Sequence, residues 1–311
     1  MTGPGRSAVV LMAYGTPAHR DDVAAYYTDI RRGRPPTDDQ LADLLRRYEA
    51  IGGLSPLTQR TEAQRAALQA GLGPDVPVVL GYKHVTPSIE DAVASAVAAG
   101  AEHLVGVVLA PHYSSASVGG YLARMTAAAP AGVSTCAVRS WAIAPAFVRF
   151  CAAEVRRGLD ALPAGSRLVV TAHSLPQRVI DGGDPYVDEL TATALAVASA
   201  AGLPSDRWQI GWQSAGRTPE PWLGPDILDI IDTLAGQGAP GVLVAAVGFV
   251  ADHLEVLYDL DIDAAAAAQR CGIRFARTAC VNDDAGVMGA LAGLVRSAID
   301  ESIPHDTPAR S

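Results

Sequence analysis

The sequence predicts an α/β fold built from two similar parallel-sheet domains, and three observations indicate it. Short apolar runs rich in β-branched residues alternate along the chain with amphipathic, alanine-rich segments. The apolar runs are continuous, which is typical of parallel strands that helices cover on both faces. Three sequence blocks also recur in the same order in the two halves of the chain.

The first two observations place the individual elements. The expected strands are the apolar runs at residues 8–13, 76–81, 104–110, 167–172, 208–212 and 241–250. Helical periodicity predicts the intervening helices at residues 38–50, 61–72, 88–99, 145–161 and 186–200. Pro145 suits the first position of its helix, where the missing N–H has no partner to lose.

The third observation, the internal repeat, predicts the domain organisation. We expect one domain at residues 1–145 and a second, similar one at residues 146–311. In the first pair of blocks, Val9–Pro17 matches Leu168–Pro176. In the second pair, Leu80–Lys83 with Thr86-Pro87 matches Ile210–Gln213 with Thr218-Pro219. In the third pair, Val105–Ala110, which precedes Tyr113, matches Val242–Val247, which precedes Phe249.

The repeat also predicts where a ligand binds. In open parallel sheets, ligands bind beyond the carboxyl ends of the strands. Tyr14 and His173 follow matching strands, one in each domain. If the two domains face each other across a central cleft, a flat ligand between them meets Tyr14 on one face and His173 on the other.

Composition excludes several classes of protein. Of the 311 residues, 49% are hydrophobic, which excludes intrinsic disorder for the body of the chain. The net charge of −9 argues against nucleic-acid binding, which needs a basic surface. No apolar run reaches the ~18–20 residues of a membrane span, so we expect a cytoplasmic protein. The four cysteines form no CxxC motif and are expected to be buried thiols: Cys136, Cys151, Cys271 and Cys280.

Two groups of side chains at strand ends are candidates for catalysis or metal binding. Neutral imidazole at His173 can accept a proton or bind a metal, although a structural histidine is an equal alternative. Glu255, Asp259 and Asp263 are spaced i, i+4 and i+8, which places them on one face of a predicted helix. Carboxylates in that arrangement suit a divalent ion, while a solvated acidic face is the commoner explanation. Glu255 lies nearest the strand end.

A cluster of arginines indicates an anionic ligand at the first domain. Five arginines lie between residues 31 and 47 of this acidic protein, and Arg31 and Arg47 are among them. Guanidinium groups bind carboxylates through two parallel hydrogen bonds. The chain has no GxGxxG, GxxxxGK[ST], GxSxG or HExxH motif, so nucleotide, hydrolase and tight zinc sites are poorly supported.

Taken together, these segments resemble the ferrochelatase family over about residues 8–296. The resemblance implies two Rossmann-like domains around a porphyrin cleft, the chelatase fold, and insertion of Fe²⁺ into a tetrapyrrole. The Ala-Tyr-Gly-Thr-Pro opening and the Arg-Arg-Gly-Arg segment resemble the monoderm-type branch, which implies coproporphyrin III as substrate and coprohaem as product in haem biosynthesis. The blocks that carry the resemblance are residues 13–17, 47–57, 172–176, 183–186, 212–214, 221–225 and 251–255.

The resemblance also implies roles for individual residues. His173 and Glu255 match the catalytic pair at the metal and the pyrrole nitrogens. Tyr14 matches an axial ligand of the product iron on the opposite face, and Asp259 and Asp263 match an acidic line that forms an outer metal site. Positions that contact the macrocycle or its propionates match Arg31, Arg47, Tyr48, Ser55 and Tyr121.

Cofactors and partners are also implied by the resemblance. Some family members hold a [2Fe–2S] cluster on one internal and three C-terminal cysteines; Cys151 lies near the internal position, but residues 303–311 contain no cysteine. We therefore expect no cluster and no cofactor beyond the substrate Fe²⁺. The expected partners are coproporphyrin III, Fe²⁺ and, transiently, other enzymes of haem synthesis, with the chain a monomer. Three alternatives stay open: a protoporphyrin IX ferrochelatase, a cobalt or nickel chelatase, and a non-catalytic haem-binding protein.

Overall fold

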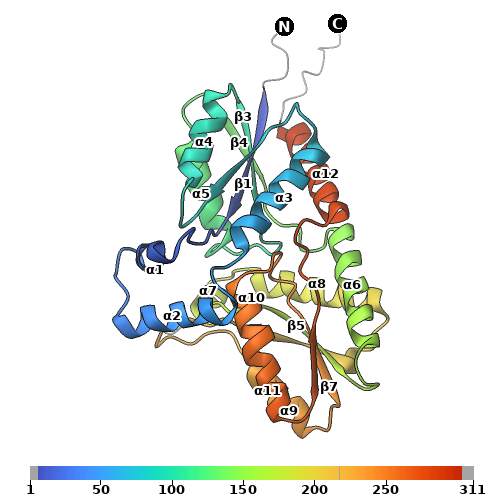
Figure 1. The fold of residues 1–311 in the computed structure, drawn as a ribbon. Coiled ribbons are helices and arrows are strands. Elements are labelled where there is room, and N and C mark those ends of the chain that lie inside the picture. The colour runs from blue at the N-terminus through green and yellow to red at the C-terminus, as the bar shows by residue number, and fades with distance from the viewer. Residues whose placement is uncertain (1–5, 217, 303–311) are drawn as a thin grey trace, which may run out of the picture.

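The computed structural model describes residues 6–216 and 218–302, which form two four-stranded sheets with helices around them (Figure 1). All neighbouring strands are parallel, which confirms the predicted α/β class. The first sheet has the order β2-β1-β3-β4, with β1 (Ser7–Ala13), β2 (Val78–Tyr82), β3 (His103–Val108) and β4 (Ser134–Val138). The second has the order β6-β5-β7-β8, with β5 (Arg167–His173), β6 (Trp208–Gln213), β7 (Gly241–Ala245) and β8 (Arg274–Arg277).

The identical strand order confirms the internal repeat: β1 to β4 correspond to β5 to β8 in sequence. One detail of the predicted alignment is wrong. The Tyr82 amide donates to the Pro87 carbonyl at 2.8 Å, and the Trp212 amide donates to the Pro225 carbonyl at 3.0 Å. The proline equivalent to Pro87 is therefore Pro225 and not Pro219.

Six strands match the predicted apolar runs, whereas the edge strands β4 and β8 were not expected. Every residue of β1 is buried, and β5 and β7 are buried almost throughout. β4 and β8 lie at the sheet edges and are mostly half-exposed, so they carry mixed polar residues rather than a continuous apolar run. The long run at 241–250 ends as a strand at Ala245 and continues as a loop.

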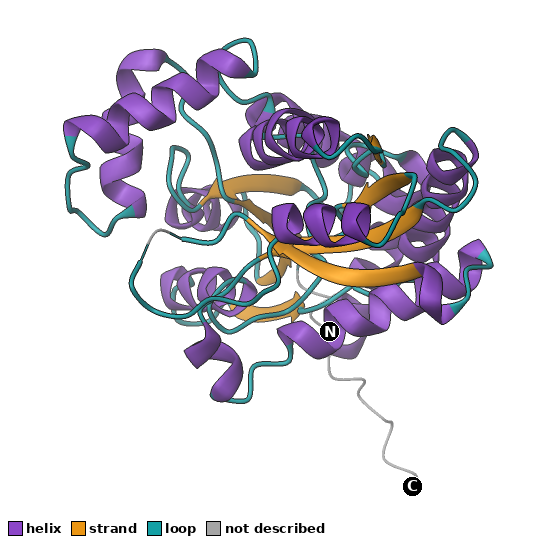
Figure 2. Ribbon diagram, turned by 90° about the horizontal axis from the view of Figure 1, so that it is seen from below, coloured by secondary structure: helices purple, strands orange, loops and turns teal. Residues whose placement is uncertain are grey.

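Helices cover both faces of the sheets (Figure 2). The five predicted helices are confirmed, although α3 begins four residues earlier than expected, at Leu57. Capping boxes at Thr37 and Ser88 fix the starts of two of them. The helices are η1 (Arg20–Asp22), α1 (Val23–Ile30), α2 (Asp38–Ala50), α3 (Leu57–Leu72), α4 (Ile89–Ala98), α5 (Val118–Ala128), α6 (Pro145–Asp160), α7 (Gln177–Asp181), α8 (Tyr186–Ala201), η2 (Ser205–Arg207), α9 (Ile227–Gly236), α10 (Leu254–Tyr258), η3 (Asp259–Ala264), α11 (Ala265–Arg270) and α12 (Ala285–Ser302).

The last helix, α12, returns from the second sheet to the first and packs against α3 (Figure 1). A Cβ on Gly71 of α3 would lie 3.0 Å from the Ala292 Cβ, so the two helices are in close contact. One core cluster extends from β1 through β5 and α6 to α12. The domain boundary at residues 145/146 stays a prediction, and its outermost residues, 1–5 and 303–311, lie outside the described residues.

Among the described residues, no helix is both long enough and apolar enough to span a membrane.

Candidate active site

The two strand orders place one crossover point in each sheet. In an order such as 2-1-3-4, the chain leaves the two central strands in opposite directions, and the crevice at their carboxyl ends is where ligands bind. Tyr14 directly follows β1, and His173 is the last residue of β5. The connection from β7 to α10 carries His253 and leads into Glu255. The sequence-predicted pair, His173 and Glu255, therefore flanks the crossover point of the second sheet.

His173 and Glu255 lie within reach of each other. The His173 Nε2 is 3.6 Å from the Glu255 Oε1, and the two side chains are 35% and 39% exposed. The His173 Nδ1 donates to the Ser174 carbonyl, which directs Nε2 toward the carboxylate. A second imidazole, His253, approaches the other carboxylate oxygen at 3.5 Å and donates from Nδ1 to the Ala251 carbonyl at 2.9 Å.

This arrangement shifts the pKa values of both groups. Burial lowers the pKa of His173, but the charge of Glu255 and hydrogen bonds to Glu255 and the Ser174 carbonyl raise it to about 9. Burial raises the pKa of Glu255, yet His173 and His253 together hold it well below its ordinary value. At neutral pH the site is therefore an imidazolium–carboxylate pair that holds one proton beside an accessible surface.

Gln213, the last residue of β6, forms hydrogen bonds with the segments that carry this pair. It is 1% exposed and donates from Nε2 to the Glu255 carbonyl at 3.4 Å. Its Oε1 accepts from the Thr171 hydroxyl at 2.9 Å, and its own carbonyl accepts from the Ser174 amide at 2.8 Å. One amide side chain thus connects the strand that carries His173 with the helix that carries Glu255.

Tyr14 approaches from the first sheet. It is 40% exposed and lies against the His84 ring, with the centroids 4.4 Å apart, and His84 Nδ1 is 2.6 Å from the Asp29 Oδ2. Burial, then the Glu255 and Asp29 carboxylates, raises the pKa of the phenol, so Tyr14 is neutral at physiological pH. Glu255 contributes to this shift although it belongs to the second half of the chain. That Tyr14 and His173 face one ligand from opposite sides stays a prediction.

The turn after β1 requires glycine next to Tyr14. Gly15 has φ +87°, a conformation that side chains other than glycine rarely adopt. A Cβ at this position would lie 2.5 Å from the Val85 Cγ2 and 3.2 Å from the Tyr82 Cβ. The residue is therefore fixed both by its backbone conformation and by the lack of space.

Three other predicted contact residues belong to the first half of the chain, and all three are buried. Tyr48 is 3% exposed, and its hydroxyl is 3.5 Å from the Thr16 Oγ1. Tyr121 is 5% exposed and lies beneath the Lys83 ammonium, 5.1 Å from the ring centroid. The Ser55 hydroxyl accepts from the Leu57 amide at 3.3 Å, which ties it to the start of α3.

The two predicted arginines differ in how they are engaged. Arg31 donates from Nε to the Arg34 carbonyl at 3.2 Å, and among the described residues no carboxylate pairs with it. Arg47 bridges the two halves: its Nη1 is 3.7 Å from the Asp259 Oδ1, and its guanidinium lies 4.8 Å over the Tyr258 ring. Arg31 is therefore the more available of the two for an anionic ligand.

The segment that carries the predicted acidic face is not one regular α-helix. Glu255 lies in α10, but Asp259 and Asp263 lie in a π-helical turn, η3, so the i, i+4 spacing is interrupted. Burial and the charge of Glu255, with a smaller contribution from Asp263, raise the pKa of Asp259 to about 6, although Ser214 and Arg47 oppose the shift. Among the described residues, no three His, Cys, Asp or Glu side chains are arranged to hold a metal ion. The outer metal site therefore stays a prediction.

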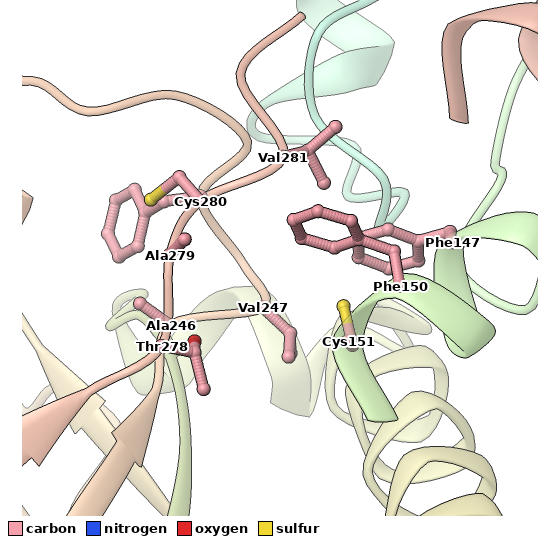
Figure 3. A pocket seen from close by; sticks show the side chains of 10 residues that line it. Phe147, Phe150, Cys151, Ala246, Val247, Thr278, Ala279, Cys280 and Val281 are labelled. Carbon is pink, nitrogen blue, oxygen red and sulfur yellow. The ribbon is translucent and has the colours of Figure 1, made fainter. Parts of the chain in front are cut away.

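Two of the four cysteines line one small pocket near the site. Cys151 and Cys280 are buried and lie on different walls of it, together with Phe147 and Phe249 (Figure 3). Burial raises the pKa of the Cys280 thiol to about 12 and that of Cys151 further. Both remain protonated thiols at neutral pH, which makes them poor metal ligands. Cys136 and Cys271 are also free thiols but are only half-buried, so the expectation of buried cysteines is wrong for these two.

Sequence reasoning missed Lys83, Gln213 and the Asp29–His84 pair as parts of the site. Lys83 follows β2 and Gln213 ends β6, so the strand-end rule that identified Tyr14 and His173 applies to them as well. Asp29 lies in α1, far from any strand end, and no spacing in the sequence connects it with His84.

Comparison with known proteins agrees with this arrangement. SirB of Bacillus subtilis, solved with Fe³⁺, shares the fold with a TM-score of 0.60 at 13% identity, covering 96% of this chain and 97% of that one. CbiX, described as the terminal enzyme for biosynthesis of sirohaem in denitrifying bacteria, gives a TM-score of 0.53 at 15% identity, covering 94% and 99%. At that identity the likeness shows the chelatase fold alone.

Sequence similarity is more specific. Residues 6–299 match the ferrochelatase family. The coproporphyrin III ferrochelatase of Geobacillus kaustophilus is 43% identical over 93% of this chain and 95% of its own, and that of Bacillus subtilis is 40% identical over 93% and 97%. A ferrochelatase of Herpetosiphon aurantiacus is 41% identical over 93% and 98%. The chain belongs to the ferrochelatase family.

Proposed function

We propose that this chain inserts Fe²⁺ into coproporphyrin III to give coprohaem, a step of haem biosynthesis. The observation that carries the proposal is the His173–Glu255 pair at the crossover point of the second sheet, opposite Tyr14 of the first. The relatives named coproporphyrin III ferrochelatases support the tetracarboxylate substrate over protoporphyrin IX.

The reaction needs a proton acceptor next to the metal. Insertion releases two pyrrole protons as Fe²⁺ binds the four nitrogens. The His173–Glu255 pair holds one proton at rest because the pKa of His173 is about 9. We infer that the charge of arriving Fe²⁺ drives this proton from Nε2 to solvent; the freed imidazole then accepts one pyrrole proton, passes it by way of Glu255 to solvent, and accepts the second. Glu255 serves this step as proton relay or metal ligand.

The macrocycle must bend before it can accept the metal. The nitrogen lone pairs of a flat porphyrin lie in the ring plane, and bending tilts them toward an ion above it. Binding energy at the periphery can supply that strain. Coproporphyrin III carries four propionates. The Arg31 guanidinium pairs with no carboxylate of the described residues, so it is suited to bind one of them. Arg47 binds a propionate in this scheme only by sharing its charge with Asp43 and Asp259.

Tyr14 serves the opposite face in this proposal. Its phenol is neutral and stands against the His84–Asp29 pair, which fixes the ring orientation. We assign it as guide or axial ligand of the iron, and Tyr48, Ser55 and Tyr121 as macrocycle contacts. We propose function without a [2Fe–2S] cluster, which needs four protein ligands, whereas the pocket of Cys151 and Cys280 is lined by two cysteines. We propose a monomer that meets other enzymes of haem synthesis only transiently.

Anaerobic insertion assays test the proposal. Coproporphyrin III and protoporphyrin IX are each mixed with Fe²⁺, and product formation is followed by absorbance. We expect faster turnover with coproporphyrin III, and loss of turnover with retained porphyrin binding in Glu255→Gln. Glu102→Gln, the same change at an exposed residue just before β3, at the strand end remote from the site, serves as the control.

Other outcomes of the same assay would contradict the proposal. Preference for protoporphyrin IX would contradict the proposed porphyrin substrate, and turnover with Co²⁺ or Ni²⁺ but not Fe²⁺ would contradict the proposed metal. Tight haem binding without any insertion would indicate a binding protein instead of an enzyme.

A further inference from the structure

The loop that carries His253 and leads into Glu255 is held by residues far from it in the sequence. Asn282, beyond β8, has φ +46°, a left-handed conformation that asparagine tolerates better than most residues. Its amide donates to the Val250 carbonyl at 2.8 Å. Its side chain exchanges two hydrogen bonds with Asp252: the Asp252 amide donates to Oδ1 at 3.0 Å, and Nδ2 donates to the carboxylate at 2.9 Å. Asn282 thus forms hydrogen bonds with the backbone of residues 250 and 252, as a neighbouring strand would.

A buried amide from the first half of the chain fastens these two loops together. Gln64 of α3 is fully buried, and its Nε2 donates to the Val250 carbonyl at 3.1 Å and to the Asn282 carbonyl at 3.0 Å. Its Oε1 has no hydrogen-bond partner among the described residues. Both donor protons of one side chain are therefore committed to two loops of the second half.

Other contacts also hold this loop. Val250 and Ala251 are buried. Figure 3 shows the segments at residues 246–247 and 278–281 together on one side of the small pocket, with Phe147, Phe150 and Cys151 on the other side. Arg60 adds a charged contact, since its Nη2 lies 3.7 Å from the Asp252 Oδ2. Arg277 supplies another one, since its Nη2 lies 3.1 Å from the Asp252 Oδ1.

The position of the loop determines the geometry of the site. His253 donates to the Ala251 carbonyl, so its ring follows the backbone that Gln64 and Asn282 hold. Glu255 lies three residues after Asp252 and reaches His173 and His253 at 3.6 Å and 3.5 Å. A displacement of about 1 Å is enough to lower a rate by ~100-fold when reacting groups must be aligned.

We propose that Gln64 is a positioning residue for metal insertion. Its amide group holds the loop at residues 250–252 against Asn282 and thereby orients His253 and Glu255 toward the porphyrin centre. Gln64 touches neither the metal nor the macrocycle in this role. The inference rests on the proposed insertion reaction. It assigns a residue from the first half of the chain to the positioning of His253 and Glu255 in the second half.

The same helix offers a matched control. Gln69 of α3 donates from Nε2 to the Gly73 and Val76 carbonyls at 2.6 Å and 3.2 Å, and its Oε1 accepts from the Val78 amide at 2.8 Å. All of these contacts lie within the first half. Gln64→Met and Gln69→Met each keep the length of the side chain and remove two donors to backbone carbonyls, but only the first affects the loop that leads into Glu255.

The experiment measures kcat, KM and porphyrin affinity of both variants in the full chain, together with their melting temperatures. We expect Gln64→Met to lower kcat about 10- to 100-fold, with porphyrin affinity changed less than about threefold. Gln69→Met is expected to lower the melting temperature by about as much as Gln64→Met does, and to keep kcat within about twofold of the wild-type value. Unchanged kcat in Gln64→Met, or activity that falls in both variants in step with melting temperature, would overturn the proposal.

Asn282→Gly keeps the test decisive if Gln64→Met does not fold. Glycine retains the left-handed backbone and removes the two side-chain bonds with Asp252. A lowered kcat with retained porphyrin binding supports the positioning role, and an unchanged kcat contradicts it. A wild-type chain that inserts no iron would instead refute the proposed function itself, so the two failures are distinguishable.

Discussion

At the scale of single residues, the site depends on one imidazole and one carboxylate that change each other's pKa. The strand-end rule predicted that His173 would lie in the site, and the spacing of the acidic residues made Glu255 the nearest carboxylate. The sequence could not predict that His253 shares the same carboxylate or that His84 lies under Tyr14, because both contacts join loops whose paths depend on tertiary packing.

The pKa of His173 gives a direct prediction. The negative charge of Glu255 stabilises the imidazolium and raises the pKa to about 9, so its removal should lower that value. In Glu255→Gln we expect the pKa of His173 to fall from about 9, because burial is then opposed only by the Ser174 hydrogen bond and the charge of Asp259. Imidazole resonances followed by NMR through a pH titration measure the change. In the Glu102→Gln control, His173 should titrate as in the wild type; an unchanged pKa of His173 in Glu255→Gln would refute the pairing.

Arg31 and His173 should differ in which kinetic constant they affect. Arg31→Ala removes a charge-assisted hydrogen bond to a propionate, so we expect porphyrin affinity to fall about 10- to 100-fold with turnover at saturation retained. His173→Ala should lower kcat by at least ~100-fold with affinity retained. Fluorescence titration and steady-state assays separate the two. Arg34→Ala controls for loss of charge in the same segment. Loss of turnover with intact affinity in Arg31→Ala would exclude the propionate contact.

At the scale of elements, apolar periodicity predicted the buried strands and the long helices well. It missed β4 and β8, whose half-exposed edge positions need no continuous apolar run. It also treated residues 255–263 as one regular helix, whereas η3 is π-helical. The i, i+4 spacing of acidic residues is compatible with either form, so the sequence pattern could not distinguish them.

The turn between β1 and α1 provides a test at this scale. Gly15→Ala must adopt φ +87° and also meets Val85 at 2.5 Å, whereas Gly33→Ala must adopt φ +82° with no atom within 4 Å. We expect Gly33→Ala to lower the free energy of unfolding by about 1 kcal/mol, the cost of the left-handed backbone alone. Gly15→Ala should lower it by about 3 kcal/mol, since displacement of Val85 adds to that cost. Urea unfolding measures both, and equal losses would show that space at Gly15 is not limiting.

At the scale of the whole molecule, the internal repeat predicted two similar parallel-sheet domains, and the two sheets indeed share one strand order. It could not predict how they are joined, since α12 follows β8 in sequence but packs on α3 of the first half. Polar contacts between the halves add to this connection. Asp184 accepts hydrogen bonds from the Ser114 hydroxyl and from the Ser115 amide, and Glu189 accepts from the Tyr113 amide.

These connections predict that the chain unfolds as one unit. The core cluster that includes Leu11, Leu168 and Leu291 is continuous across both sheets, so neither half can lose its packing alone. We expect a single calorimetric transition whose van't Hoff and calorimetric enthalpies agree. Two resolved transitions would show that the halves are energetically independent.

A crystal structure of the chain with coproporphyrin III tests the central claim most directly. We expect a bent macrocycle between the two sheets, with His173 Nε2 and the Glu255 carboxylate facing the pyrrole nitrogens on one side and the Tyr14 phenol on the other. A porphyrin bound elsewhere on the surface, or one whose nitrogens lie far from both His173 and Glu255, would contradict it.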